Sequence, residues 1–95
     1  MSVRRVLVVD DHPVNRTLVS VLLRDAGWHV EEAVNGNDGL AKLATGTFDT
    51  VLLDISMPDI SGDEVCRRIR ADAQLKNLRV IAYTAHALDN ERDQI

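Results

Sequence analysis

The chain has 95 residues, of which 45% are hydrophobic and 27% charged, and its formal net charge is −4. That length allows one small domain, and the interspersed charges provide no basic block for binding nucleic acid or an anionic membrane. We therefore expect no nucleic-acid binding by this chain alone and no membrane contact. A single cysteine and the lack of any signal-peptide pattern near the start favour a cytoplasmic location.

Three short apolar runs, rich in β-branched residues, predict strands that are buried on both faces of a parallel sheet. These runs are residues 6–9, 51–53 and 80–83. Residues 28–34 mix apolar and acidic side chains, which is typical of an edge strand.

Helices are predicted between these strands. Apolar residues at helical spacing indicate the first helix, and they are Val14, Leu18, Val21 and Leu22. Pro13 suits its first turn and Gly27 its end. A second helix is expected after residues 35–37. Ser61 and Glu64 have capping-box spacing ahead of a third helix.

The alternation of strands and helices predicts right-handed βαβ units, and therefore an α/β fold with a doubly wound parallel sheet. A weaker fourth helix is expected from residue 87 to the end. A sheet whose fourth strand is 78–83 usually continues, so we expect a fifth strand and helix to be missing. The apolar edge at 78–83 would then be unpaired, which favours self-association.

Oxygen-bearing side chains follow or end three of the predicted strands, and they are Asp10, Asp11, Asp54 and Thr84. Ligands of open α/β sheets bind beyond the carboxyl ends of the strands. Clustered carboxylates repel unless a cation lies among them, and oxygen ligands favour Mg²⁺ or Mn²⁺. Asp54 lies centrally, and a carboxylate can accept a phosphoryl group, so metal-assisted phosphoryl transfer is predicted. His12 and His86 flank this site, and both are expected to be exposed loop residues.

Three stretches match the motifs of one family. Residues 8–16 (VVDDHPVNR) resemble the opening of a response-regulator receiver domain, residues 54–62 (DISMPDISG) its phosphorylation site, and residues 83–87 (YTAHA) its switch. The resemblance implies a CheY-like, flavodoxin-like sheet, here with strand order 2-1-3-4. It also implies that residues 1–95 form one receiver domain that is incomplete at its C-terminal end.

The resemblance also implies a division of roles. Asp54 would accept a phosphoryl group, in a Mg²⁺-dependent reaction, from a phosphohistidine on a sensor histidine kinase or histidine phosphotransfer protein. Asp11 would bind the metal directly, Asp10 would act through the metal's shell, and the Ser56 backbone carbonyl would complete the protein ligands. The Thr84 hydroxyl would bind the phosphoryl oxygens. Such a chain is a signalling domain that promotes its own phosphorylation and dephosphorylation rather than an enzyme.

One alternative function stays open, and two others conflict with residues of this chain. The family's lysine would lie beyond Ile95, and neither Lys42 nor Lys76 is expected to replace it, which favours a pseudo-receiver: a protein-interaction module without productive phospho-switching. A haloacid-dehalogenase-type phosphatase would need an acid where Ser56 stands. A flavodoxin-like cofactor site would want hydroxyls and amides, not acids, after the first strand.

Overall fold

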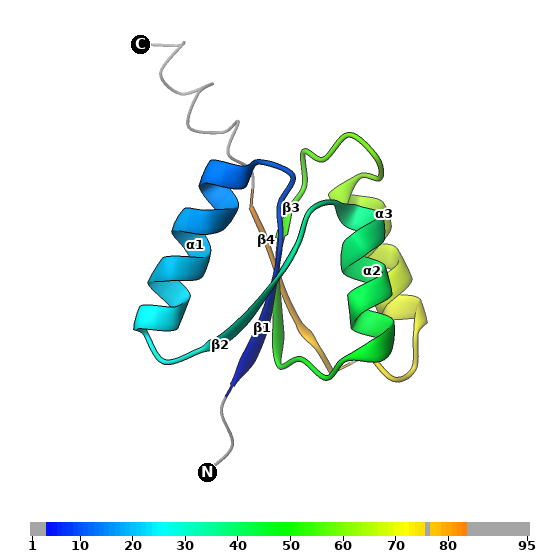
Figure 1. Ribbon diagram of the computed structural model, residues 1–95. Helices are drawn as coiled ribbons and strands as arrows, with labels where there is room; N and C mark the ends of the chain where they lie inside the picture. The colour runs from blue at the N-terminus through cyan, green and yellow to red at the C-terminus, as the bar shows by residue number, and fades with distance from the viewer. Residues whose placement is uncertain (1–3, 76, 84–95) are drawn as a thin grey trace.

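The computed structural model describes residues 4–75 and 77–83. Strands and helices alternate along this part of the chain, as predicted (Figure 1). The elements are β1 (Arg5–Val9), α1 (Pro13–Asp25), β2 (His29–Ala33), α2 (Gly36–Thr45), β3 (Thr50–Asp54), α3 (Gly62–Ala71) and β4 (Arg79–Tyr83). The fourth helix expected from residue 87 lies outside the described residues.

The strands form one parallel sheet in the order β2-β1-β3-β4, which confirms the predicted topology and the edge position of the second strand. Helix α1 covers one side of the sheet, and α2 and α3 lie on the other (Figure 1). All four carboxyl ends therefore meet at one edge, which is the upper edge in Figure 1.

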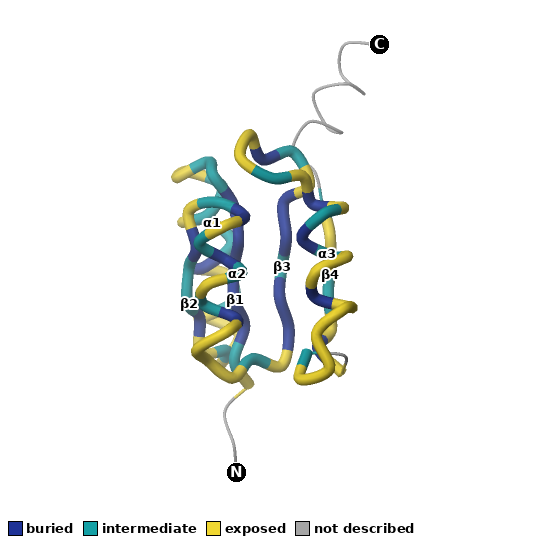
Figure 2. The backbone as a smooth tube through the Cα atoms, turned by 90° about the vertical axis from the view of Figure 1, so that its right-hand side faces the viewer, coloured by how far each residue is buried: buried dark blue, intermediate teal, exposed yellow. Residues whose placement is uncertain are grey.

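Successive side chains of the central strands point to opposite faces, and each face packs into its own apolar cluster. Leu7 and Val9 join the larger cluster, together with Val65 and Ile69 of α3. Val6 and Val8 join the smaller one, beneath α1. Figure 2 shows β1 and β3 buried along most of their length. This double burial explains why their sequences are almost continuously apolar.

The helix ends follow the predicted signals with one correction. Pro13 opens α1, and Gly27 adopts a positive φ of 97° after its end. Ser61 Oγ accepts from the Glu64 N–H at 3.2 Å, which caps α3. Helix α2 begins at Gly36 rather than after residue 37, because the Asn35 side chain already accepts from the Asp38 N–H at 2.8 Å.

The apolar stripe that predicted α1 does not face the core. Val14 is 80% exposed, and Leu18, Val21 and Leu22 are more than half exposed, while Val19 and Leu23 pack on the sheet. Ile81 of β4 is also 45% exposed; it pairs with Leu52, whose side chain belongs to the cluster beneath α1. Within the described residues, the α1 side of the sheet is therefore only partly covered.

Candidate metal and phosphoacceptor site

The sheet brings the predicted acids together. Strands β1 and β3 are neighbours in which Val9 pairs with Leu53, so the next residues, Asp10 and Asp54, lie side by side. Both carboxylates are completely buried, and Asp11 is partly exposed. Single ligand atoms from Asp10, Asp11, His12 and Asp54 all lie within 4.8 Å of one another. The strand ends thus form one compact acidic cluster, which we call the acid cluster, with His12 at its rim.

Both carboxylate oxygens of Asp10 have protein donors. Oδ1 accepts from the His12 N–H at 2.8 Å, and Oδ2 accepts from the Tyr83 hydroxyl at 2.5 Å. The Asp10 backbone carbonyl accepts from Arg16 Nη1 at 2.7 Å. With both oxygens engaged, Asp10 is better placed to orient water around a cation than to bind the cation directly.

Asp54 has one satisfied oxygen and one unsatisfied oxygen. Oδ1 accepts from the Ser56 N–H at 3.0 Å, whereas the buried Oδ2 has no hydrogen-bond donor among the described residues, and neither does the buried Asp11 Oδ1. Burial raises the pKa of Asp54, and Asp10 and Asp11 raise it further, although the Ser56 N–H opposes them. Buried carboxylate oxygens that accept no hydrogen bond are costly. A hard divalent cation would satisfy both oxygens, so the donor set fits Mg²⁺ or Mn²⁺.

The loop after β3 holds this site in place. Met57 anchors it in the larger apolar cluster, where Cys66 also packs as a partly buried thiol. Gly62 approaches the loop so closely that a Cβ there would lie 2.6 Å from Ile55 Cα. Asp59 accepts from the N–H groups of Gly36 and Asn37, which joins the loop to the start of α2.

This arrangement of acids, loop and sheet occurs in a known family. Residues 6–95 match the family described as response regulator receiver domain. The chain belongs to this family. It is a phosphoacceptor domain of two-component signalling, related to the chemotaxis protein CheY and to the receiver domains of histidine kinases.

Several relatives show how close this similarity is. The chain is 40% identical to the chemotaxis protein CheY of Pseudomonas aeruginosa over 92 residues, covering 96% of this chain and 72% of the relative. It matches the histidine kinase BarA of Escherichia coli at 36% identity but spans only 10% of that protein.

Two solved structures complete the comparison. One is the receiver domain of the Pseudomonas aeruginosa sensor histidine kinase PA1611, which was solved with a magnesium ion coordinated in its active site cleft. It aligns with this chain at a TM-score of 0.84 and 30% sequence identity, and the alignment covers 97% of this chain and 75% of the PA1611 chain. The other is a structure of the histidine kinase ThkA in complex with the response regulator TrrA. The match has a TM-score of 0.80 and 43% sequence identity, and it covers 86% of this chain and 69% of the matched chain.

The structure of this receiver domain brings together most, not all, of the predicted site residues. Asp10, Asp11 and Asp54 converge, and Ser56 stays beside Asp54. Thr84 and His86 lie outside the described residues. Lys42 binds the Glu32 carbonyl and lies 3.4 Å from Asp38, so its ammonium group is engaged at the end of β2.

Two residues of the site depart from expectation. His12 was expected to be an exposed loop residue. It does precede α1 with a side chain that is 44% exposed, but its Nδ1 faces the acids, 3.1 Å from Asp11 Oδ1 and 3.3 Å from Asp10 Oδ1. Tyr83 was assigned to a strand and to the start of the switch motif, with no role at the site, yet its hydroxyl donates to Asp10. The sequence feature that could have indicated this role is the position of Tyr83 at the end of β4, where it pairs with Asp54.

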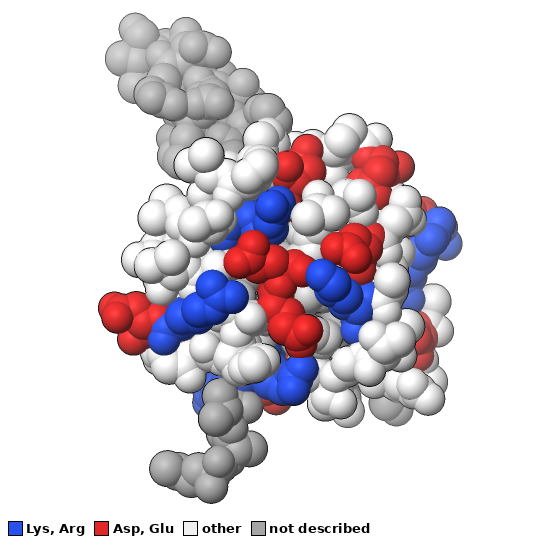
Figure 3. Space-filling view, in the orientation of Figure 1, with Lys and Arg blue, Asp and Glu red and all other residues white. Residues whose placement is uncertain are grey.

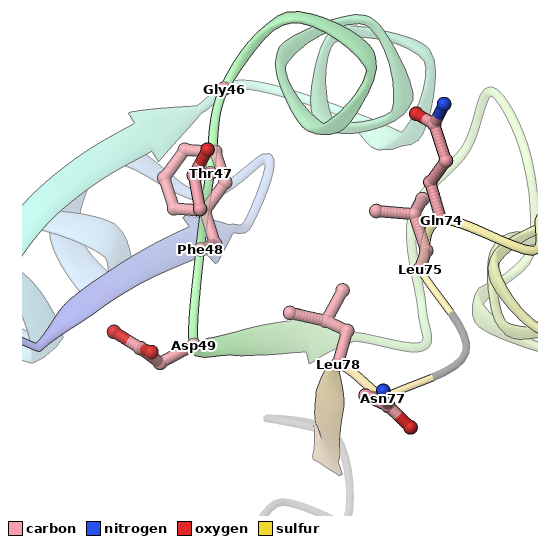
Figure 4. Close-up of a pocket in the computed structure, with 8 residues that line it drawn as sticks. All are labelled: Gly46, Thr47, Phe48, Asp49, Gln74, Leu75, Asn77 and Leu78. Carbon is pink, nitrogen blue, oxygen red and sulfur yellow. The ribbon is translucent and has the colours of Figure 1, made fainter.

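A depression lies at the opposite end of the sheet from the acid cluster, before β3 and β4 (Figure 4). Its apolar lining comes from Phe48, Leu75 and Leu78. The Asp49 carboxylate accepts a hydrogen bond from the Arg5 backbone N–H at 2.7 Å. These groups join neighbouring segments and bring no reactive cluster together, so the acid cluster is the better candidate for function.

Proposed function

We propose that Asp54 is the residue of this receiver domain that accepts the phosphoryl group. The observation that carries the proposal is the buried Asp54 carboxylate, which lies among two other acids with one oxygen lacking a hydrogen-bond donor within the described residues. Such an oxygen retains its lone pairs for a cation or for phosphorus. Asp10 and Asp11 are the remaining acids of the cluster, and each has a separate role.

In the proposed reaction a carboxylate oxygen of Asp54 attacks the phosphorus of a phosphohistidine. The new O–P bond forms as the P–N bond breaks, and the departing imidazole keeps the electron pair of that bond and takes up a proton. The Ser56 N–H holds the Asp54 carboxylate in orientation through Oδ1. Bound Mg²⁺ would neutralise charge on the phosphoryl oxygens. The Thr84 hydroxyl is proposed to donate to the same oxygens, and hydrolysis of the acyl phosphate would return the domain to its resting state.

The proposed metal ligands are Asp11, Asp54 and the Ser56 backbone carbonyl, with Asp10 acting through bound water. The first two are supported by the Asp11 and Asp54 oxygens that accept no hydrogen bond from the described residues. The outer position of Asp10 is supported by the hydrogen bonds to both of its carboxylate oxygens. Mg²⁺ is the proposed physiological ion, because it commonly retains waters and binds one or two carboxylates together with phosphate oxygens. Mn²⁺ would also fit the site.

The proposed phosphodonor is a sensor histidine kinase or a histidine phosphotransfer protein. The related regulator TrrA was solved in complex with the histidine kinase ThkA, which supports this class of partner. In the part of the chain that the structure describes, no helix is long and apolar enough to cross a membrane. The cytoplasmic location stays a prediction from the sequence.

We also propose that two copies associate through the outer edge of β4. The opposite edge, β2, carries charged side chains that disfavour pairing with another strand. Glu31 forms an ion pair with Arg5 at 2.6 Å, and Glu32 forms one with Arg16 at 3.1 Å. Figure 3 shows acidic and basic side chains interspersed over that face. By contrast, β4 presents Ile81, which is 45% exposed, and an outer edge that no described strand covers.

Light scattering at rising concentration tests this association. Ile81→Lys should keep the protein monomeric. Val34→Lys, at a similarly exposed apolar position beyond β2, should leave the association unchanged. A wild-type chain that stays monomeric at high concentration would refute the proposal.

The phosphoacceptor role is tested by incubating the chain with a small acyl phosphate and Mg²⁺ and measuring intact mass. One phosphoryl adduct should form, should disappear with a chelator, and should be absent from Asp54→Asn. Asp49→Asn is a matched control, because it removes a carboxylate at the far end of β3. A folded wild-type chain that forms no adduct would favour the pseudo-receiver reading.

A further inference from the structure

We propose that His12 is a ligand of the cation in the acid cluster, and that its imidazole strengthens the binding of Mn²⁺ and similar ions relative to the binding of Mg²⁺. The inference rests on the metal site proposed above and adds a nitrogen donor to its oxygen ligands. Neither the acids alone nor the strand-end geometry requires such a donor.

Distances within the cluster support this role. His12 Nδ1 lies 3.1 Å from Asp11 Oδ1, 3.3 Å from Asp10 Oδ1 and 3.6 Å from Asp54 Oδ2. Adjacent ligands of an octahedral ion with bonds of about 2.1 Å are separated by about 3.0 Å, and opposite ligands by about 4.2 Å. The spacing from Nδ1 to its acidic neighbours falls within these limits. A small cation could therefore contact Nδ1, Asp11 and Asp54 with little rearrangement.

The backbone directs the imidazole towards the cluster. The His12 N–H donates to Asp10 Oδ1 at 2.8 Å, and its extended φ and ψ of −92° and 111° suit a residue before proline. Its side chain makes no capping bond to α1. The ring is 44% exposed, yet Nδ1 itself is buried against the acids. The unsatisfied Oδ2 of the fully buried Asp54 points into the same space.

The chemistry of the donors predicts the selectivity. Mg²⁺ binds oxygen ligands almost exclusively, whereas imidazole suits the first-row transition ions. A site with two carboxylates and one imidazole should therefore gain affinity for Mn²⁺ from the nitrogen, with little gain for Mg²⁺. The competing explanation is that a protonated His12 serves as the counter-cation of the acids and moves away when a metal binds.

Pulsed electron paramagnetic resonance of the Mn²⁺-loaded chain separates these explanations. Direct ligation predicts a strong ¹⁴N coupling that is lost in His12→Gln and retained in His29→Gln and His86→Gln, the variants of the other histidines. Bound Mn²⁺ without ¹⁴N coupling would overturn the role of His12 and leave the acidic site intact. If neither Mn²⁺ nor Mg²⁺ bound the folded wild type, the metal site itself would fail.

Calorimetry supplies a second readout. His12→Gln should weaken Mn²⁺ binding by roughly tenfold, the lower end of the loss usual on altering residues that support a metal site. Mg²⁺ affinity should change by less than about twofold, since oxygen ligands dominate its binding. Equal losses for both ions would contradict the proposed selectivity. Circular dichroism and the melting temperature establish that the variant is folded, as expected because the His12 side chain does not cap α1.

Discussion

The Tyr83 hydroxyl donates a 2.5 Å hydrogen bond to Asp10 Oδ2, which joins the end of β4 to the acid cluster across 73 positions of sequence. Burial raises the pKa of Tyr83 far above its usual value, and the bond to Asp10 adds to the effect, so the phenol keeps its proton throughout the working pH range. Tyr83 directly precedes the predicted switch residue, Thr84. The acid cluster is therefore linked to the residue that precedes the predicted switch position.

Tyr83→Phe should destabilise the metal-free protein more than the Mg²⁺-bound protein. The change removes the donor to a buried carboxylate oxygen, a loss of about 1–3 kcal/mol. Waters around a bound cation would replace that donor and reduce the loss. Urea unfolding with chelator and with saturating Mg²⁺ measures both values. Equal losses in the two conditions would show that Tyr83 and the metal site are not coupled.

Asp59→Ala should destabilise the fold by about 0.5–2 kcal/mol, the usual range for losing a helix cap. Burial works against ionisation of Asp59, but the Asn37 and Gly36 N–H groups outweigh it and lower the pKa of its carboxyl. Asp25→Ala is the matched control, because an exposed acid at the end of α1 opposes the helix dipole. Denaturant midpoints compare the two; equal midpoints would contradict the capping role of Asp59.

Ser20→Ala should stabilise the protein by about 0.5–1.5 kcal/mol. Ser20 is fully buried in α1, and its hydroxyl has no hydrogen-bond partner among the described residues. Alanine removes this desolvated hydroxyl and favours the helix. Thr17→Ala, at an exposed position of the same helix, should stabilise the protein only through the higher helix propensity of alanine. A lower melting temperature for Ser20→Ala than for wild type would mean that the hydroxyl has a partner after all.

The metal-free domain should lose stability from the acid cluster as pH rises. Asp54 has its pKa raised above 3.8 by burial and by the neighbouring acids, and His12 has its pKa raised above 6.5 chiefly by Asp11. Both groups hold protons more tightly when folded, so the slope of stability against pH is negative in each window. The contribution of Asp54 to the free energy of unfolding falls as pH rises from 3.8 to its raised pKa. The contribution of His12 falls as pH rises from 6.5 to its own raised pKa.

Other carboxyls, including Asp59 and Glu64, have lowered pKa values and act in the opposite direction at acid pH. The comparison is therefore made between variants. Asp54→Asn should remove the fall in stability across the lower pH window, and His12→Gln should remove the fall across the upper window. Saturating Mg²⁺ should reduce both falls in the wild-type protein. Unfolding midpoints measured with chelator across both windows give the slopes. Parallel profiles for wild type and both variants would contradict this account.

The sequence predicts the sheet and its acids well because both depend on local patterns. Buried parallel strands require the apolar runs that end at Val9 and Leu53, and adjacent strand ends must place Asp10 and Asp54 together. The direction of the His12 ring depends instead on backbone angles before Pro13, and the reach of Tyr83 depends on the register of β4 with β3. Periodicity found α1, but it could not show which of its apolar residues the sheet covers.

The phosphoacceptor role of Asp54 is tested most directly by locating the phosphoryl group along the chain. The phosphorylated protein, formed with an acyl phosphate and Mg²⁺, is reduced with borohydride, which converts an aspartyl phosphate to homoserine, and its peptides are sequenced by mass spectrometry. The account predicts homoserine at position 54 alone, and only when Mg²⁺ is present. Homoserine at Asp10, Asp11 or another acid, with position 54 unmodified in the folded protein, would contradict it.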